Sequence, residues 1–279
     1  MPRRASDALG VPVLAAIGLQ LAYPLTHGTA RDRITMATVV VVAAASVGHA
    51  TLTRGRRGLA CCVVAGSVGF CAEVVGVHTG VPFGDYSYSG SLGWQVAGVP
   101  IIAGLAWTML AWPAALVARR LAGSAPMRVL IGGWALASWD LFLDPQLVAA
   151  GHWRWAHPDP HLPGVPTVPL TNFAGWLLVS MAISLAVQAI LGHTAPRPTA
   201  AARSPRVAPR GVSGRRQPAN EWTPRADDRW MVAFYLWTYV SSIVGLLAFL
   251  HLQAAALWGA LGMGVVAGPL ANRLRAEIG

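Results

Sequence analysis

The chain has 279 residues, of which 54% are hydrophobic and 11% are charged, and its mean hydropathy is +0.50. Soluble globular domains are much more polar, so this composition excludes most soluble classes and predicts a polytopic membrane protein. The formal net charge is +10 and every one of the 21 basic residues is an arginine. Because the arginines lie between apolar runs, they predict membrane orientation, and we expect no nucleic-acid partner.

Eight apolar runs are long enough to cross a bilayer as helices, which takes about 20 residues each. We therefore predict an all-α polytopic membrane protein with about eight transmembrane helices. The first run follows Arg3 and Arg4, as in a signal peptide, but no convincing cleavage site follows it, so we expect a retained helix. The runs are residues 8–25, 34–52, 59–78, 96–118, 129–150, 172–192, 230–250 and 253–271.

The arginines also predict on which side of the membrane each loop lies. If the N-terminus is cytoplasmic, 18 of the 21 arginines fall in cytoplasmic segments, in agreement with the positive-inside rule. We expect a multi-pass protein of the cell membrane, in direct contact with the lipid bilayer, with both termini in the cytoplasm.

Composition divides the chain into three parts. Residues 1–192 are expected to form a six-helix membrane core that carries the functional site. Residues 193–229 are rich in Pro, Arg, Ala and Ser without apolar periodicity, which predicts a disordered cytoplasmic linker; contact with anionic lipid or a partner enzyme is the alternative. Residues 230–279 predict a C-terminal transmembrane hairpin and tail, with a tight turn near His251. The hairpin has no embedded acid, so we expect it to be structural.

Two stretches of the core repeat one pattern, which predicts an internal duplication. In each, an acid is followed after 11 residues by a Gly-x-aromatic-x-aromatic run, then by Gly-Val-Pro and a tryptophan. The third and fourth runs would then be related to the fifth and sixth by a parallel repeat. The first copy comprises Glu73, Gly84–Tyr88, Gly98–Pro100 and Trp107; the second comprises Asp140, Gly151–Trp155, Gly164–Pro166 and Trp176.

Three acids lie inside the apolar runs: Glu73, Asp140 and Asp144. An ionisable group in a membrane span costs about 2.5–3.5 kcal/mol on insertion scales, so such residues are functional candidates. Asp140 and Asp144 are four residues apart on one helix face, where they can share a proton or a water. All three are predicted in the outer halves of their helices, near one cavity. The alternative is that they pair with Arg154 or bind backbone groups.

Aromatic pairs occur in both loops that follow the acids. Tyr86 and Tyr88, and likewise Trp153 and Trp155, are two residues apart, so each pair points to one side of an extended strand. Two such strands predict an aromatic lid over the acids, and an aromatic face stabilises a nearby cation by about 0.5–2 kcal/mol. The alternative is an aromatic belt at the membrane interface.

The predicted chemistry needs no cofactor and no metal site. The sequence has no phosphate-binding glycine loop, no dinucleotide fingerprint, no Cys-x-x-Cys pair and no aspartate-rich motif of isoprenoid transferases. A carboxyl group in an apolar site stays protonated near neutral pH and can donate its proton. Protonation of a trisubstituted double bond gives a tertiary carbocation, which water captures when a second carboxylate removes its proton. We therefore expect acid/base chemistry on a lipid-soluble substrate.

These motifs resemble those of the membrane carotenoid hydratases of the CruF type. The resemblance covers residues 70–177 and rests on the repeated acid, aromatic and Gly-Val-Pro motifs, on Asp144-Pro145 and on Asn172-Phe173-x-Gly175-Trp176. It implies a hydro-lyase that adds water to the 1,2 double bond of an acyclic (ψ) carotenoid end and forms a tertiary 1-hydroxy end. A carotenoid would then be the substrate, with other enzymes of its biosynthesis as further partners.

Two alternatives remain open. Small membrane lycopene cyclases also begin by protonating an end-group double bond, but their expected Pro-x-Glu-Glu motif corresponds here to Pro169-Leu170-Thr171-Asn172. An alternative of another class is a non-catalytic carotenoid or lipid carrier, or a transporter. That protein would need a path with polar groups at both ends.

Roles follow from depth in the membrane. We expect Asp140, the deeper aspartate, to donate the proton and Asp144 to activate the water, while Glu73 holds that water or exchanges roles with Asp140. Asn172 would orient a carboxyl group by hydrogen bonding. The residues expected to stabilise the substrate and its cation are Tyr86, Tyr88, Trp107, Trp153, Trp155 and Trp176.

The rest of the substrate is expected to bind through apolar contact alone. A long polyene offers no polar group to hold, so the sequence predicts an apolar groove that opens sideways to lipid. We expect small residues such as Gly76 and Gly104 to line it.

Overall fold

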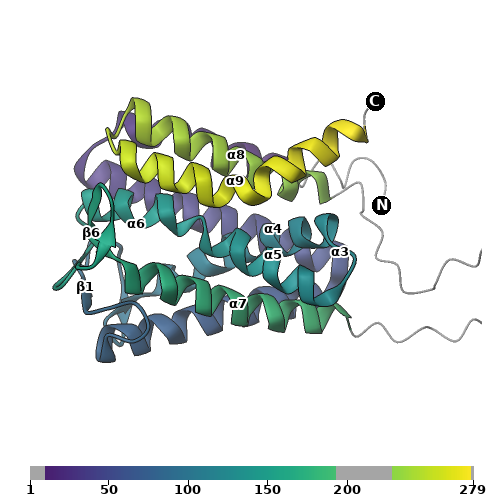
Figure 1. Ribbon diagram of the computed structural model, residues 1–279, viewed down its shortest axis with the longest axis horizontal. Coiled ribbons are helices and arrows are strands. Elements are labelled where there is room, and N and C mark those ends of the chain that lie inside the picture. The colour runs from purple at the N-terminus through teal and green to yellow at the C-terminus, as the bar shows by residue number, and fades with distance from the viewer. Residues whose placement is uncertain (1–9, 193–227, 278–279) are drawn as a thin grey trace, which may run out of the picture.

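The computed structural model describes residues 10–192 and 228–277 and contains a bundle of helices with short strands at one end (Figure 1). Five helices are long and apolar enough to cross a membrane, which confirms the all-α membrane class: α3 (Gly28–Thr79), α4 (Ile101–Leu121), α7 (Leu170–Gly192), α8 (Arg229–Ala248) and α9 (Gln253–Ala276). The shorter helices are α2 (Gly10–Ala22), η1 (Tyr23–Leu25), α5 (Ala125–Ala137) and α6 (Asp140–Ala149). The predicted linker lies outside the described residues except for Asp228 and Arg229, at the start of α8.

Helix α3 consists of two arms because the chain reverses direction at Gly55. Gly55 has φ 61° and ψ −143°, a conformation that glycine adopts without strain. A Cβ placed on Gly58 would overlap the carbonyl oxygen of Ala50. In a straight helix eight residues rise about 12 Å, so this contact requires the chain to fold back. The arms, residues 28–54 and 56–79, contain the predicted runs 34–52 and 59–78.

The predicted run 129–150 is interrupted in the structure. Helix α5 ends at Ala137 and α6 begins at Asp140, with Ser138 and Trp139 between them. Both intervening residues keep right-handed helical φ and ψ, so the chain continues in the same general direction. The break puts Asp140 in the first turn of α6.

Six short strands form three antiparallel pairs at one end of the bundle, which we call the sheet end (Figure 1). The important pair is β1 (Tyr86–Tyr88) with β4 (Trp153–Trp155), in which Tyr86 lies opposite Trp155 and Tyr88 opposite Trp153. It joins the loop after α3 to the loop after α6. The other pairs are β2 (Gln95–Val96) with β3 (Val99–Pro100), and β5 (His161–Leu162) with β6 (Val165–Pro169).

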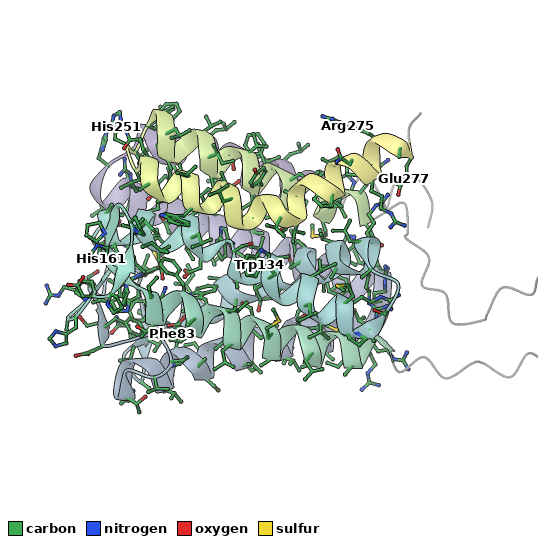
Figure 2. The ribbon with its side chains drawn as sticks, in the orientation of Figure 1. Phe83, Trp134, His161, His251, Arg275 and Glu277 are labelled. Carbon is green, nitrogen blue, oxygen red and sulfur yellow. The ribbon has the colours of Figure 1, made fainter. Side chains whose placement is uncertain are left out.

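Helices α8 and α9 form the predicted C-terminal hairpin. The turn between them contains His251 and lies at the sheet end, as His161 does (Figure 2). Arg275 and Glu277 lie at the opposite end of the bundle. The hairpin packs on the rest of the bundle through small residues. At Gly259 of α9, a Cβ would overlap the ring of Phe142 in α6, so this close approach requires glycine.

We predict that Gly259→Ala lowers the melting temperature of the purified protein in detergent, because the added methyl group overpacks the α6–α9 contact at a typical cost of about 1–3 kcal/mol. Gly18→Ala in α2 is the matched control, since a Cβ there meets nothing within 4 Å. Alanine favours an exposed helix position over glycine by roughly 0.5–1 kcal/mol, so the control should melt at the same temperature or higher. Equal melting temperatures for both variants would contradict the packing described.

Candidate active site

Glu73 is held by donors from three other positions of the chain. It lies buried in the second arm of α3. Its Oε2 atom accepts hydrogen bonds from the hydroxyl groups of Tyr88 (2.9 Å) and Tyr86, and its Oε1 atom accepts one from Nε1 of Trp107 (3.1 Å). Strand β1 and helix α4 therefore fix this carboxyl group. Three convergent donors suit an ionised carboxylate, which can only accept.

The two tyrosines stay protonated and act as donors. Burial, followed by the neighbouring charge of Glu73, raises the pKa of Tyr86 and the pKa of Tyr88 above the ordinary value of a phenol. Their hydroxyl groups consequently keep the proton that each hydrogen bond to Glu73 needs. The tyrosines therefore position Glu73 as well as presenting aromatic rings.

Asp140 and Asp144 meet at one amide group. Nδ2 of Asn172, in the first turn of α7, donates to Oδ2 of Asp140 (2.8 Å) and to Oδ2 of Asp144. All three side chains are buried, and the shared amide holds the two carboxyl groups next to each other. Two negative charges this close repel strongly, whereas one shared proton removes the repulsion and supplies the bond between them. The pair is thus built to hold a proton.

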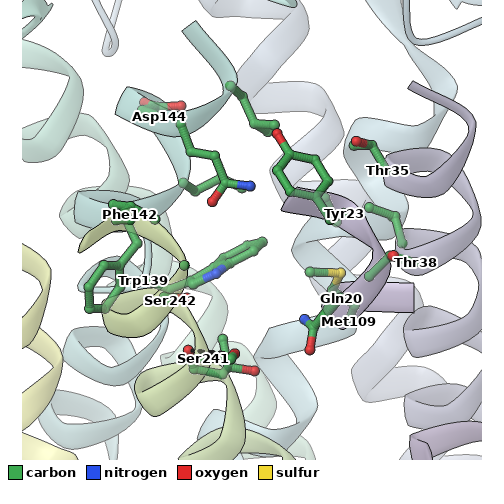
Figure 3. Close-up of a pocket in the computed structure, with 18 of the residues that line it drawn as sticks. Gln20, Tyr23, Thr35, Thr38, Met109, Trp139, Phe142, Asp144, Ser241 and Ser242 are labelled. Carbon is green, nitrogen blue, oxygen red and sulfur yellow. Dashed lines mark hydrogen bonds between the residues drawn. The ribbon is translucent and has the colours of Figure 1, made fainter. Parts of the chain in front are cut away.

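A cavity of about 320 Å³ lies against these acids (Figure 3). Glu73, Asp144 and Asn172 line it, and its other lining side chains carry no formal charge. Figure 3 shows Asp144, Phe142 and Trp139 on one side of the space, with Tyr23, Thr35 and Thr38 on the other. The structure therefore brings two of the three predicted acids to one largely apolar cavity.

Asp140 does not belong to the cavity wall. It is fully buried behind Asp144, and its Oδ1 atom has no hydrogen-bond partner among the described residues. The sequence predicted Asp140 as the proton donor because it is the deeper acid. Depth also separates it from the space that a substrate could enter, so Asp144 is the aspartate in a position to touch one.

Five of the six predicted aromatic residues line the cavity: Tyr86, Tyr88, Trp107, Trp153 and Trp176. Trp107 stacks on Trp176 with ring centroids 3.9 Å apart and planes at 18°. Tyr88 meets Trp153 edge to face at 5.5 Å. The sixth, Trp155, stacks behind Tyr86 at 5.6 Å and donates to the carbonyl oxygen of Phe83 (2.9 Å), so it supports the wall.

Other wall residues were missed by the sequence reasoning. Trp139, between α5 and α6, meets Trp176 edge to face at 6.2 Å. Gln20 of α2 and Trp237 of α8 also line the cavity. Residues of the C-terminal hairpin therefore also line the cavity, although the sequence predicted a structural role for the hairpin and a site within residues 1–192. No acid marks α8 in the sequence, so its contribution depends on packing between distant segments.

The predicted glycine-lined groove is also wrong in its placement. Neither Gly76 nor Gly104 lines the cavity. A Cβ on Gly76 would lie 2.7 Å from the Phe83 ring, and one on Gly104 would lie 3.3 Å from Phe70. Both glycines permit helices or loops to pack closely and do not leave room for a ligand.

The loops over the site are tied together by His152. Its Nδ1 atom lies 2.8 Å from the hydroxyl group of Ser91, and the backbone N–H of Ser89 donates to its carbonyl oxygen (2.8 Å). Burial lowers the pKa of His152, with Asp32 opposing the shift, so the imidazole is neutral near pH 7. Arg154, the alternative partner for the acids, points to the exposed side of β4.

Strand β5 begins in a second histidine-bearing loop. His157 and His161 are four residues apart, and Nδ1 of His161 hydrogen bonds Oδ1 of Asp159 (2.7 Å). Within residues 10–192 and 228–277, no three His, Cys, Asp or Glu side chains converge in a way that could hold a metal ion.

Comparison with known proteins gives one family and one relative. The sequence model of the family described as "Carotenoid biosynthesis protein" matches residues 33–209. A bisanhydrobacterioruberin hydratase of Haloarcula japonica is 36% identical over 111 residues, which cover 38% of this chain and 36% of that protein. The match thus spans about a third of the relative's length. No solved structure matches.

The family match includes Glu73, Asp140, Asp144 and Asn172, and so contains every carboxyl group of the cavity cluster. It also extends over more than half of the chain. This chain therefore belongs to the carotenoid biosynthesis protein family.

Proposed function

We propose that this protein is a hydro-lyase that adds water to the 1,2 double bond of an acyclic carotenoid end group and forms a tertiary 1-hydroxy end. The observation that carries the proposal is an aspartate pair, joined by Asn172, in which Asp144 faces an otherwise largely apolar cavity. Family membership and a relative named as a hydratase support the same reaction class. Water addition needs a proton donor, a base and a water molecule, so the proposal includes no cofactor.

The proton goes from Asp144 to C2 of the double bond. Asp144 faces the cavity, and Asn172 donates a hydrogen bond to the carboxylate that remains after transfer. Asp140 is the positioning partner that shares the proton before transfer. The bond electrons move to form the C2–H bond, which leaves a tertiary cation at C1.

Glu73 is the base in this proposal. Its three hydrogen-bond donors favour the ionised form against the opposing effect of burial, and in this form Glu73 lines the same cavity as the proton donor. A water molecule attacks C1 and gives its proton to Glu73, and this proton returns to Asp144 through water. The rings of Tyr88, Trp107 and Trp176 line the same space and stabilise the cation while it exists.

The membrane arrangement that we propose has eight spans and both termini in the cytoplasm. The five long helices count α3 once, although its two arms are two spans. This additional arm, the α5–α6 unit and α2 supply the other three spans. The two acid-bearing segments then run in the same direction as a parallel repeat, with their loops joined by the β1–β4 pair. Charge distribution supports this orientation, with the sheet end outside.

We predict that Asp144→Asn lowers hydration by about 10²–10⁴-fold, because the amide keeps the shape but has no acidic proton. Glu73→Gln should have a similar effect through loss of the base, and Asp140→Asn a smaller one. Asp159→Asn, whose side chain is 81% exposed, is the matched control. The measurement is mass analysis of pigments in a host that makes an acyclic carotenoid. A product one water heavier from wild type and control, and none from Asp144→Asn, is expected.

Other products would change the conclusion. An isomer of equal mass from the wild type would indicate cyclisation, and unchanged pigment would indicate a carrier. Normal hydration by both Asp144→Asn and Glu73→Gln would contradict the assigned roles.

We predict that a cysteine at Ser89 is labelled by an impermeant thiol reagent from outside the cell, and that a cysteine at Ser124 is not. Both positions are exposed, and α4 separates their ends of the bundle by 21 residues, or about 30 Å. Cys71 is the exposed native thiol and is replaced by serine in both variants. Labelling of Ser124→Cys in intact cells, or equal labelling of both, would contradict the proposed orientation.

A further inference from the structure

The cavity extends from the acids along a groove between α2 and α8. On α8 its lining residues recur every three or four positions, as one face of a helix does: Trp237, Ser241, Val244 and Gly245, with Thr238, Val240 and Ser242 beside them. On the other side it is lined by Gln20, Leu21, Tyr23 and Pro24 of α2 and η1. The groove thus joins two helices that are more than 200 residues apart in sequence.

This groove opens on the outer surface of the bundle. Leu21, Val240 and Val244 line the cavity, and yet they are 57%, 52% and 50% exposed. An apolar residue that lines the cavity and is also exposed on the outside of the bundle marks the place where the cavity opens. In a membrane protein this place faces lipid, so the cavity communicates sideways with the bilayer interior.

The packing of α2 on α8 sets where the opening begins. At the end away from the strands the helices touch, since a Cβ on Gly10 would overlap the ring of Trp230. Further along, Nε1 of Trp237 donates to Oε1 of Gln20 (2.6 Å). Helix α2 ends at Ala22, two residues after Gln20, and is followed by η1 (Tyr23–Leu25). Beyond this point α2 no longer lies beside α8. The opening therefore lies between the Gln20–Trp237 hydrogen bond and the sheet end.

The chemistry of the groove suits a hydrocarbon chain. Glu73 and Asp144 are the only charged residues in the cavity lining, and four of the lining hydroxyl groups of α3 and α8 are bonded to carbonyl oxygens of their own helices. Thr238 donates to the carbonyl oxygen of Phe234 (2.9 Å), and Thr38 donates to that of Ile34 (2.8 Å). These hydroxyl groups need no partner from a ligand. An apolar chain in the groove therefore breaks none of these hydrogen bonds.

The volume of the cavity limits how much of a polyene chain it can enclose. At about 320 Å³ the cavity is at the lower end of the ~300–1,000 Å³ range of pockets that enclose drug-sized ligands. A carotenoid is a rigid rod much longer than such a ligand. Only its end group and the adjoining part of the polyene can fit, and the remainder must pass through the opening.

We propose that the groove between α2 and α8 binds the polyene chain of the substrate end-on, with the end group at Asp144 and the far end outside in the bilayer. This inference rests on the proposed carotenoid reaction for the identity of the occupant. The Gln20–Trp237 pair positions the chain by closing the groove on the side away from the strands. Because the far end stays outside, the protein recognises one end at a time and does not distinguish substrates by the structure of their other end.

The test narrows the opening with a large ring. Leu21→Trp and Val244→Trp place an indole in the groove, while Val265→Trp on α9 is the matched control, because Val265 is 62% exposed and does not line the cavity. Each protein is purified from a host that makes an acyclic carotenoid. Bound pigment is measured by visible absorbance per protein, and hydration is measured separately by mass. Both groove variants should retain about tenfold less pigment than wild type. The added indole takes the space of the polyene, and the typical free-energy cost of overpacking weakens binding by about this factor. The control should match the wild type.

Several outcomes separate the two proposals. If the wild type binds pigment without hydrating it, and the groove variants lose the pigment, the groove stands and the proposed reaction falls. If Leu21→Trp and Val244→Trp both bind and hydrate normally, the groove proposal is overturned while the hydratase assignment stands. Loss of co-purified phospholipid with normal pigment binding would show a lipid-filled groove and would also overturn it. Val240→Trp serves as a third groove variant if either of the first two is poorly folded, as judged by its melting temperature.

Discussion

The fold and the site both depend on burying three carboxyl groups in an apolar bundle. Each buried acid has to be satisfied by hydrogen bonds or a shared proton, because an isolated charge in this environment is strongly unfavourable. The chain meets the requirement in two different ways. Glu73 receives three donors, whereas Asp140 and Asp144 share the amide of Asn172. This difference between the two environments is the basis for proposing that one carboxyl group acts as a base and another as an acid.

Much of the remaining architecture holds those environments in place. The β1–β4 pair brings Tyr86 and Tyr88 over Glu73, and α7 carries Asn172 to the aspartates. The strands come from loops that are more than 60 residues apart, so the site closes only when both halves of the core are assembled. The rings of Tyr88, Trp107 and Trp176 line the cavity beside these carboxyl groups.

Local patterns in the sequence were sufficient to predict the helices and most of the site. Apolar runs located the helices, and an acid inside such a run is conspicuous, which is why Glu73 and Asp144 were identified without coordinates. Asn172 was identified from the family resemblance. The two-residue spacing of Tyr86 and Tyr88 predicted that both side chains point to the same side of a strand. What could not be predicted depends on contacts between distant segments. Nothing local indicates that Trp237 of α8 reaches the cavity, that Asp140 is covered by Asp144, or that Gly76 packs against Phe83. Continuous and interrupted helices look alike as apolar runs, so the reversal at Gly55 and the break at Ser138 could be seen only in the structure.

The central claim, acid/base addition of water without a cofactor, is tested most directly by isotope incorporation. Purified protein, treated with a chelator, is incubated with an acyclic carotenoid in water enriched in both oxygen-18 and deuterium, and the product is analysed by mass spectrometry. The account predicts one oxygen-18 atom at C1 and one carbon-bound deuterium atom at C2. Deuterium without oxygen-18 would contradict it by showing that the cation is lost to cyclisation or isomerisation, and a product with neither isotope would show that the carboxyl groups do not protonate the double bond.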